Sequence, residues 1–317
     1  MSDLLILLVI AVASYILSKS ADLVVASVSS LARRFGVSEF NLGFFILGLA
    51  TSTPELFVGL NSVIYATPEL SLGNLIGASI ILLSLIIGLT AVLNKEVRFG
   101  NSFGRKDILL TSFVILSPAF LLFDGLLSRF DGLFLIFFYV LFYLFLNRQQ
   151  SFAERIEQKL SSHKLDFLKI AAKMLIGVAG LAITSKVIVE AAELMAVTWN
   201  LPLVLVGLVF LAIGTNLPEL TIMFKSTVRN HKQIALGDFL GSAAANTPIL
   251  GFIALLSPIQ LTAPVKIYAS LVMLFISLVT FNAFFQSERK LTRLEGAALV
   301  GLYGFFLFME LFLRNQL

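Results

Sequence analysis

Residues 48–56 read GLATSTPEL, and residues 212–220 read AIGTNLPEL. Four of these nine positions are identical at a constant offset of 164 residues, including a Pro–Glu pair inside an apolar stretch. The same offset aligns LGNLIGA at 72–78 with LGDFLGS at 236–242. Because one offset holds over two successive segments, the chain is predicted to be an internal duplication.

The surrounding composition is that of a polytopic membrane protein. Of the 317 residues, 58% are hydrophobic and 13% are charged, whereas soluble domains have about 25% charged residues. Disordered chains, nucleic-acid modules and secreted disulfide scaffolds are excluded, the last because Cys is absent. The two histidines, His163 and His231, lie in charged stretches, so a zinc, haem or histidine-based centre is not expected.

Apolar runs separated by polar breaks predict an all-α membrane fold of ten spanning helices. The first apolar run has no positively charged segment before it, so we expect it to be a retained helix and not a signal peptide. The predicted spans are 3–32, 39–65, 71–94, 107–123, 130–147, 167–198, 202–226, 233–257, 264–285 and 294–313.

The long polar stretch 148–165 divides the chain into a first five-helix repeat at 1–147 and a second at 166–317. Because five is odd, the second repeat is expected to cross the membrane inverted relative to the first, an arrangement typical of transporters. Sixteen basic residues fall in alternate loops, against three on the other side. The positive-inside rule places these loops and 148–165 in the cytoplasm and both termini outside, with the plasma membrane as the expected location.

Glu55 and Glu219 are the most informative residues, because a charge at membrane depth is costly and is normally functional. The proline before each glutamate removes a backbone donor and predicts a broken helix with a free carbonyl one turn upstream. Carboxylates, carbonyls and hydroxyls are hard ligands suited to Ca²⁺ and Na⁺. The alternative is a structural role, in which each glutamate bonds a neighbouring helix or pairs with Lys19 or Lys186.

Other polar and small residues extend this motif. Ser242 and Asn246 lie four apart on one helix face, so both are expected to face the same cavity. The glycines of the two LGxxxG segments suit close helix packing, and a site role remains open for them. Lys19–Asp22 and Lys186–Glu190 have the spacing of local helical ion pairs, with a gating role as the alternative.

On these motifs the chain resembles the sodium/calcium exchanger family, whose repeats carry G-T-S-x-P-E followed by G-N-x-x-G-S. The resemblance covers essentially the whole chain. It implies that Glu55 and Glu219 are central Ca²⁺ ligands and that Thr51 and Thr215 add oxygen ligands. It further implies an ion-binding core of helices 2, 3, 7 and 8, across which helices 1 and 6 slide. The remaining implied site residues are Gly48 and Ala212, which offer carbonyls to Na⁺, and Ser52 and Asn216 at the motif's Ser positions.

The family usually has Ser beside the second Gly and Asn or Asp one turn later in both repeats. The first repeat here has Ala78 and Leu82 at these positions, which offer no side-chain oxygen. In the second repeat, Asp238 replaces the Asn found at Asn74. A full set of Na⁺ sites is therefore in question, and proton coupling becomes an alternative. We expect a secondary antiporter that exchanges Ca²⁺ for Na⁺ or H⁺. The alternatives are a monovalent cation/proton antiporter, and an intramembrane enzyme or a non-transporting protein of this fold.

The sequence shows no GxSxG, no HExxH and no histidine within a span. We therefore expect no enzyme activity and no cofactor. The expected partners are the lipid bilayer and the transported cations, without nucleic acid or an obligate protein partner.

Overall fold

The computed structural model describes residues 3–34, 42–98, 104–146, 164–229, 232–261, 264–288 and 290–313. Within them nine helices are long and apolar enough to span a membrane, and a tenth span is formed by a bent helix pair. This confirms the predicted ten-helix fold. The predicted linker 148–165 lies outside the described residues, apart from 164 and 165 at the start of a helix.

The helices of the first repeat follow the predicted spans closely. They are α1 (Asp3–Arg34), α3 (Gly48–Thr51), α4 (Thr53–Ile64), α5 (Pro68–Ile80), α6 (Ile87–Asn94), α7 (Arg105–Leu121) and α8 (Arg129–Leu146). Two π-helical segments, η1 (Leu42–Leu47) and η2 (Ile81–Ile86), and a short 3₁₀ turn, η3 (Leu122–Asp124), complete them. The third span begins at Pro68 and not at 71, because proline is well suited to the first turn of a helix.

The second repeat follows the same order of spans, but its third span is one continuous helix. Its helices are α10 (Lys164–Thr198), α11 (Leu203–Val206), α12 (Ala212–Thr215), α13 (Leu217–Arg229), α14 (Lys232–Leu256), α15 (Pro264–Glu288) and α16 (Arg293–Phe308). The π-helical segments are η4 (Gly207–Leu211) and η5 (Met309–Leu313). Since η1–α3 and η4–α12 both end directly before the motif, the 164-residue offset holds in the backbone as well as in the sequence.

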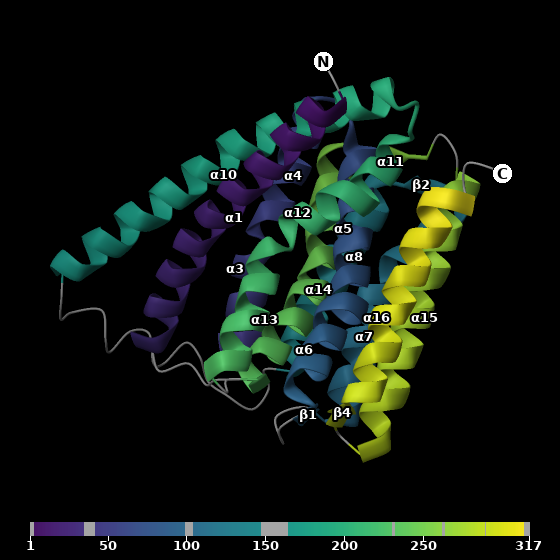
Figure 1. The fold of residues 1–317 in the computed structure, drawn as a ribbon. Coiled ribbons are helices and arrows are strands. Elements are labelled where there is room, and N and C mark those ends of the chain that lie inside the picture. Colours follow the sequence, from purple (N-terminus) through teal and green to yellow (C-terminus); the bar gives the residue numbers. More distant parts are fainter. Residues whose placement is uncertain are drawn as a thin grey trace.

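Four short strands were not predicted. β1 (Glu96–Arg98) pairs antiparallel with β4 (Lys290–Thr292), and β2 (Leu126–Leu127) pairs antiparallel with β3 (Ile259–Gln260). Adding 164 to 96 gives 260 in β3, and adding it to 126 gives 290 in β4. The repeat therefore converts one strand pair into the other. Figure 1 shows β2 near the upper end of the molecule and the β1–β4 pair at the lower end, as inverted repeats require.

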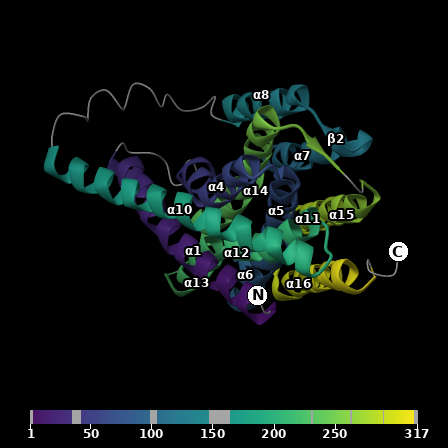
Figure 2. The same cartoon turned by 90° about the horizontal axis from the view of Figure 1, so that it is seen from above.

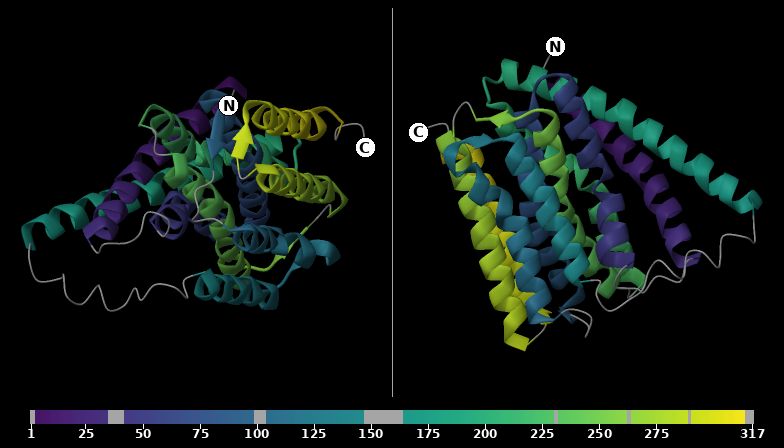
Figure 3. Two further views of the ribbon diagram at one scale, coloured as in Figure 1. Left: turned by 90° about the horizontal axis from the view of Figure 1, so that it is seen from below. Right: turned by 180° about the vertical axis from the view of Figure 1, so that it is seen from behind.

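The molecule has an inner group of helices between two outer groups. α1 and α10 pack along each other and run obliquely across one side (Figure 1). Seen from above and from behind, α7, α8, α15 and α16 lie on the other sides of the central α5 and α14 (Figures 2 and 3). The spans of α5 and α14 are 83% and 78% buried, against 22% for α8 and 28% for α16. Because the central spans are the most buried, the repeated motif beside them lies at the protected centre of the molecule.

Candidate cation-binding site

The second span of each repeat is interrupted at the motif. Ser52 separates α3 from α4 and Asn216 separates α12 from α13, both with ψ near zero instead of the helical value. In the first repeat the two helical pieces meet at a bend of 43°. The proline two residues after each break lacks the N–H that a continuous helix needs. The predicted broken helices are therefore present in the structure, and they lie next to the motif carboxylates.

Three carboxylates are buried around these breaks. Glu55 and Glu219 are each 1% exposed, and Asp238 on α14 is fully buried. One carboxylate oxygen of each has no hydrogen-bond partner. The helix before each glutamate packs against the opposite repeat, α3 against α14 and α12 against α5, so both motifs lie at the repeat interface. Since buried polar atoms are nearly always satisfied, these unpartnered oxygens suit bound cations.

Thr51 is the centre of the first oxygen cluster. Its hydroxyl lies 2.7 Å from Ser242 Oγ and 3.2 Å from Asp238 Oδ1. Ser242 in turn lies 3.3 Å from the carbonyl oxygen of Gly48. These residues come from α3 of one repeat and α14 of the other. Four predicted or neighbouring site residues therefore meet across the repeat interface, and all of their contacting atoms are oxygens.

The equivalent cluster around Thr215 is different. Its hydroxyl donates to Asn74 Oδ1 at 3.2 Å, and the Asn74 amide nitrogen has no partner. Ala78, which is buried at the position equivalent to Ser242, supplies no hydroxyl. Each threonine therefore links its own broken helix to the other repeat, Thr51 to α14 and Thr215 to α5.

The predicted carbonyl ligands already accept hydrogen bonds. Gly48 O accepts from the backbone N–H of Ser52 at 3.2 Å and from its hydroxyl at 2.9 Å. Ala212 O accepts from the side-chain amide of Asn216 at 2.7 Å, which leaves Asn216 Oδ1 buried without a partner. The carbonyl freed by Pro54, that of residue 50, accepts from the Thr53 hydroxyl. Its oxygen is thus not free, contrary to the prediction of an open carbonyl one turn before the proline.

Asn246 makes its hydrogen bonds away from the other predicted ligands. Its amide nitrogen donates to Ser79 Oγ at 3.1 Å and to Leu75 O at 3.3 Å, both on α5. It lines a small, mostly apolar cavity together with residues of α5, α7 and α15. One turn of α14 thus separates the oxygen cluster at Ser242 from this second location. Ser242 lies in the oxygen cluster and Asn246 lines the other cavity, so the expectation that both side chains face one cavity is wrong.

The glycines of the second motif segment have a packing role. A Cβ on Gly77 would overlap the carbonyl oxygen of Leu208, and one on Gly241 would overlap that of Phe44. Leu208 and Phe44 are themselves 164 residues apart, so the two contacts are equivalent. Each glycine lets its helix approach the backbone of the other repeat's π-helical segment. This close approach brings α5 and α14 against the broken helices that carry the ligands.

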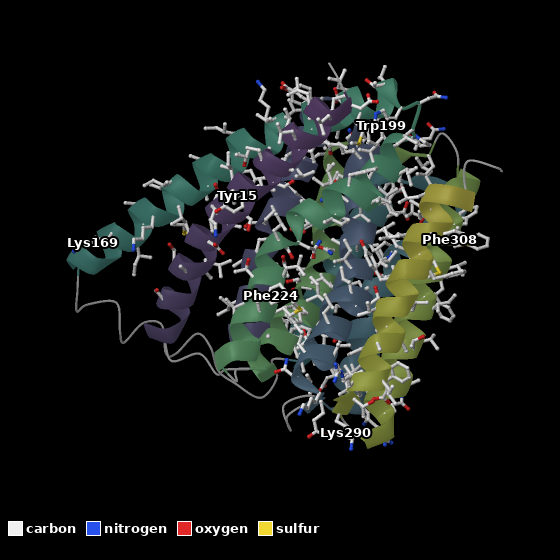
Figure 4. The ribbon with its side chains drawn as sticks, in the orientation of Figure 1. Tyr15, Lys169, Trp199, Phe224, Lys290 and Phe308 are labelled. Carbon is white, nitrogen blue, oxygen red and sulfur yellow. The ribbon has the colours of Figure 1, made fainter. Side chains whose placement is uncertain are left out.

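The charged residues on α1 and α10 form local pairs, as their spacing predicts. Lys19 Nζ lies 3.5 Å from Asp22, and Lys186 Nζ lies 3.9 Å from Glu190. All four side chains are between a third and about half exposed, so neither lysine neutralises a motif glutamate. Figure 4 labels Lys169 and Trp199 at opposite ends of α10, with side-chain oxygen atoms at mid-height among the central helices.

Sequence reasoning missed two members of this region as site residues. Asp238 contributes a third buried carboxylate, and Asn74 is the partner of Thr215. The signal for Asp238 was present, because it is an acidic residue in an apolar span. Asn74 stands at the Asn position of the G-N-x-x-G-S pattern, which is the signal that could have marked it.

Inverted five-helix repeats with broken helices and buried acidic residues at their interface define a secondary transporter of cations. The sodium/calcium exchanger protein family matches residues 5–147 and 169–312. The chain therefore belongs to the sodium/calcium exchanger family of cation antiporters and is an integral multi-pass membrane protein. The predicted family and fold are confirmed.

Several known proteins are similar over most of their length. The chain is 31% identical over 248 residues to the inner membrane protein YrbG of Escherichia coli, covering 75% of this chain and 76% of that protein. It is 26% identical to the sodium/calcium exchanger MaX1 of Methanosarcina acetivorans, with 92% and 94% covered. A solved structure of the sodium-calcium exchanger NCX_Mj superposes with a TM-score of 0.69 over 96% of this chain and 98% of that one, at 22% identity.

Proposed function

We propose that this protein exchanges Ca²⁺ for Na⁺ across the cell membrane, with Glu55 and Glu219 as the central Ca²⁺ ligands. The observation that carries the proposal is the pair of buried glutamates, one from each inverted repeat, each with an oxygen that has no partner. Two carboxylates balance one divalent cation, and the neighbouring hydroxyl and amide oxygens are hard ligands. Similarity to MaX1, which carries the name of a sodium/calcium exchanger, supports the proposal.

Alternating access follows from the arrangement of the helices. α1 and α10 form an outer pair, and each packs more extensively against the other than against any single inner helix. The proposal is that this pair slides across the core and opens the glutamates to one side at a time. Both termini are proposed to lie outside and the 148–165 linker in the cytoplasm. The protein is proposed to be a transporter that needs no cofactor, and not an enzyme.

Exchange of Ca²⁺ for H⁺ is the second candidate, and the first repeat favours it. Ala78 and Leu82 are buried and supply no side-chain oxygen where a hydroxyl or an amide would complete a Na⁺ position. A glutamate can then release its cation by taking up a proton instead. A monovalent cation/proton antiporter would use the same two glutamates.

The test is Ca²⁺ uptake into proteoliposomes that contain the purified protein. Uptake is driven first by an outward Na⁺ gradient and then by an outward H⁺ gradient, with the Glu55→Gln/Glu219→Gln double variant as the control. We expect uptake under the Na⁺ gradient that the control lacks. Uptake under the H⁺ gradient alone would replace Na⁺ by H⁺ as the coupling ion. Absence of Ca²⁺ movement under both gradients would refute the proposal.

A further inference from the structure

We propose that Asp238 is a third acidic ligand of the transport site. Together with the hydroxyls of Thr51 and Ser242, it holds a monovalent cation while the glutamate pair holds a divalent cation. This inference rests on the proposed function and adds a second ion position to it. The two ions would be bound at the same time.

The first argument is the incomplete bonding of Asp238. The side chain is fully buried on α14, and one of its oxygens accepts the Thr51 hydroxyl at 3.2 Å. The other oxygen has no hydrogen-bond partner, and the described residues show no ion pair to this carboxylate. A buried carboxylate with a purely structural role is expected to have its hydrogen bonds satisfied. The free oxygen is therefore available to a cation.

The second argument is the set of oxygens beside Asp238. The hydroxyl oxygens of Thr51 and Ser242 lie 2.7 Å apart, and that of Thr51 lies 3.2 Å from Asp238 Oδ1. Ser242 Oγ also lies 3.3 Å from the carbonyl oxygen of Gly48. All four atoms are hard oxygen ligands of the kind that alkali cations prefer.

The third argument comes from the equivalent position in the other half. There Thr215 meets Asn74, whose unpaired atom is an amide nitrogen, and Ala78 replaces the second hydroxyl. An N–H donor repels a cation, whereas the carboxylate of Asp238 attracts one. The structure therefore provides this additional position on the Thr51 side only.

Charge balance is consistent with a second ion. A divalent cation neutralises the two glutamates, and an ionised Asp238 at membrane depth would need a positive charge of its own. Among the described residues, the acidic and histidine side chains form no compact group of three that could hold one metal ion. The position at Asp238 is therefore treated as separate from that of the divalent ion.

The experiment measures the exchange of radioactive for unlabelled Ca²⁺ across proteoliposomes, with equal Na⁺, K⁺ or a bulky organic cation on both sides. We expect wild-type exchange to be stimulated by Na⁺ or K⁺ relative to the organic cation. Asp238→Asn should raise the half-saturating monovalent concentration about tenfold or more, because a charged ligand commonly contributes at least one decade of affinity. Asp238→Glu should keep the stimulation. Asp124→Asn, an acid-to-amide change at the exposed η3 turn, is the matched control and should respond as wild type.

A second measurement does not depend on transport. In detergent and saturating Ca²⁺, added Na⁺ or K⁺ should raise the melting temperature of the wild type and not that of Asp238→Asn. The inference is overturned if Na⁺ and K⁺ only inhibit wild-type exchange or lower its melting temperature, because the ions then compete for one site. It is also overturned if Asp238→Asn responds as wild type. Failure of the wild type to exchange Ca²⁺ under any condition would instead refute the proposed function, and this inference with it.

Discussion

The two halves of the candidate site share a backbone but differ in chemistry. Around Thr51 the inverted repeats bring together a carboxylate, two hydroxyls and a carbonyl, so every contacting atom is an oxygen. Around Thr215 the equivalent positions hold an amide and Ala78, and the unpaired atom is a nitrogen. The π-helical segment before each motif, the break and the glycine contacts are nevertheless repeated at the same offset.

This difference distinguishes the features that support the helix packing, which both repeats share, from the side chains that select the ion, which differ between the repeats. The glycine contacts and breaks occur in both copies, since each is needed to bring a broken helix against the opposite repeat. The side chains at 78 and 242, and at 74 and 238, do not carry the packing and have diverged. We therefore expect substitutions at symmetric positions to have equal effects in the scaffold and unequal effects in the ligand shell.

The largest expected effect is at the shared glutamates. Glu55→Gln or Glu219→Gln should each reduce exchange by roughly two orders of magnitude or more. Each variant removes the buried pairing of a carboxylate with Ca²⁺; breaking a buried charge pair costs about 3–5 kcal/mol, and each 1.4 kcal/mol is about tenfold. The measurement is Ca²⁺ flux in proteoliposomes, with gel filtration to verify folding. Normal flux in either variant would show that the two halves do not share one central ion.

The next effect tests the symmetry of the scaffold. Gly77→Ala and Gly241→Ala should both lower the stability of the protein by about 1–3 kcal/mol or more, because each new methyl group overlaps a backbone carbonyl that cannot rotate away. Melting temperatures in detergent measure this effect. Gly301→Ala, where a methyl group meets no atom within 4 Å, is the control and should be neutral or slightly stabilising. Tolerance of alanine at only one of the two glycines would break the proposed equivalence.

A smaller effect is expected when the ligands absent from the first repeat are restored. Ala78→Ser combined with Leu82→Asn places a hydroxyl and an amide at the positions equivalent to Ser242 and Asn246. If their absence weakens a Na⁺ position, the double variant should need several-fold less Na⁺ for half-maximal exchange, since one neutral ligand contributes about 1 kcal/mol. An unchanged Na⁺ dose response would mean that these positions do not determine the coupling ion.

The smallest effect concerns the two sliding helices, which also differ. α10 is bonded to the first repeat by Asn61–Ser185, Tyr65–Glu190 and Thr67–Glu193, all near the α4–α5 turn. The hydrogen bond to Glu190 raises the pKa of the Tyr65 hydroxyl above its usual value, so this donor stays protonated at neutral pH. The side-chain hydrogen bonds that the described part of α1 donates stay within α1. The structure therefore holds α10 more firmly on one side of the membrane.

Tyr65→Phe should weaken this contact by about 1 kcal/mol and shift the balance between the inward-open and outward-open states about fivefold. The apparent Ca²⁺ affinity should rise on one side of the membrane and fall on the other, measured in vesicles of defined orientation. Ser112→Ala removes a comparable hydrogen bond between α7 and α15, outside the sliding pair, and should shift neither side. Equal changes on both sides would argue against a role in gating.

The fold could be predicted almost completely from the sequence, because hydropathy, the repeated motif and the odd number of helices in each half leave one arrangement. The four short strands were missed, since two- and three-residue strands carry no periodic signal. Thr51 and Ser242 meet across the repeats, and both glutamates are buried, but their role as ligands stays a prediction. The location of Asn246 could not be predicted, because one helical turn decides which neighbouring helix it meets. The role of Asp238 depends on a contact across the repeats that no local pattern contains.

Whether Glu55 and Glu219 together bind one divalent cation is tested most directly by an anomalous-scattering map from crystals of this protein that have been soaked in Sr²⁺, a heavier substitute for Ca²⁺. We expect one strong peak within coordinating distance of carboxylate oxygens of both Glu55 and Glu219. The peak should disappear in the Glu55→Gln/Glu219→Gln variant. A Sr²⁺ peak elsewhere, with no density between the two glutamates at saturating concentration, would contradict shared binding of one divalent cation by Glu55 and Glu219.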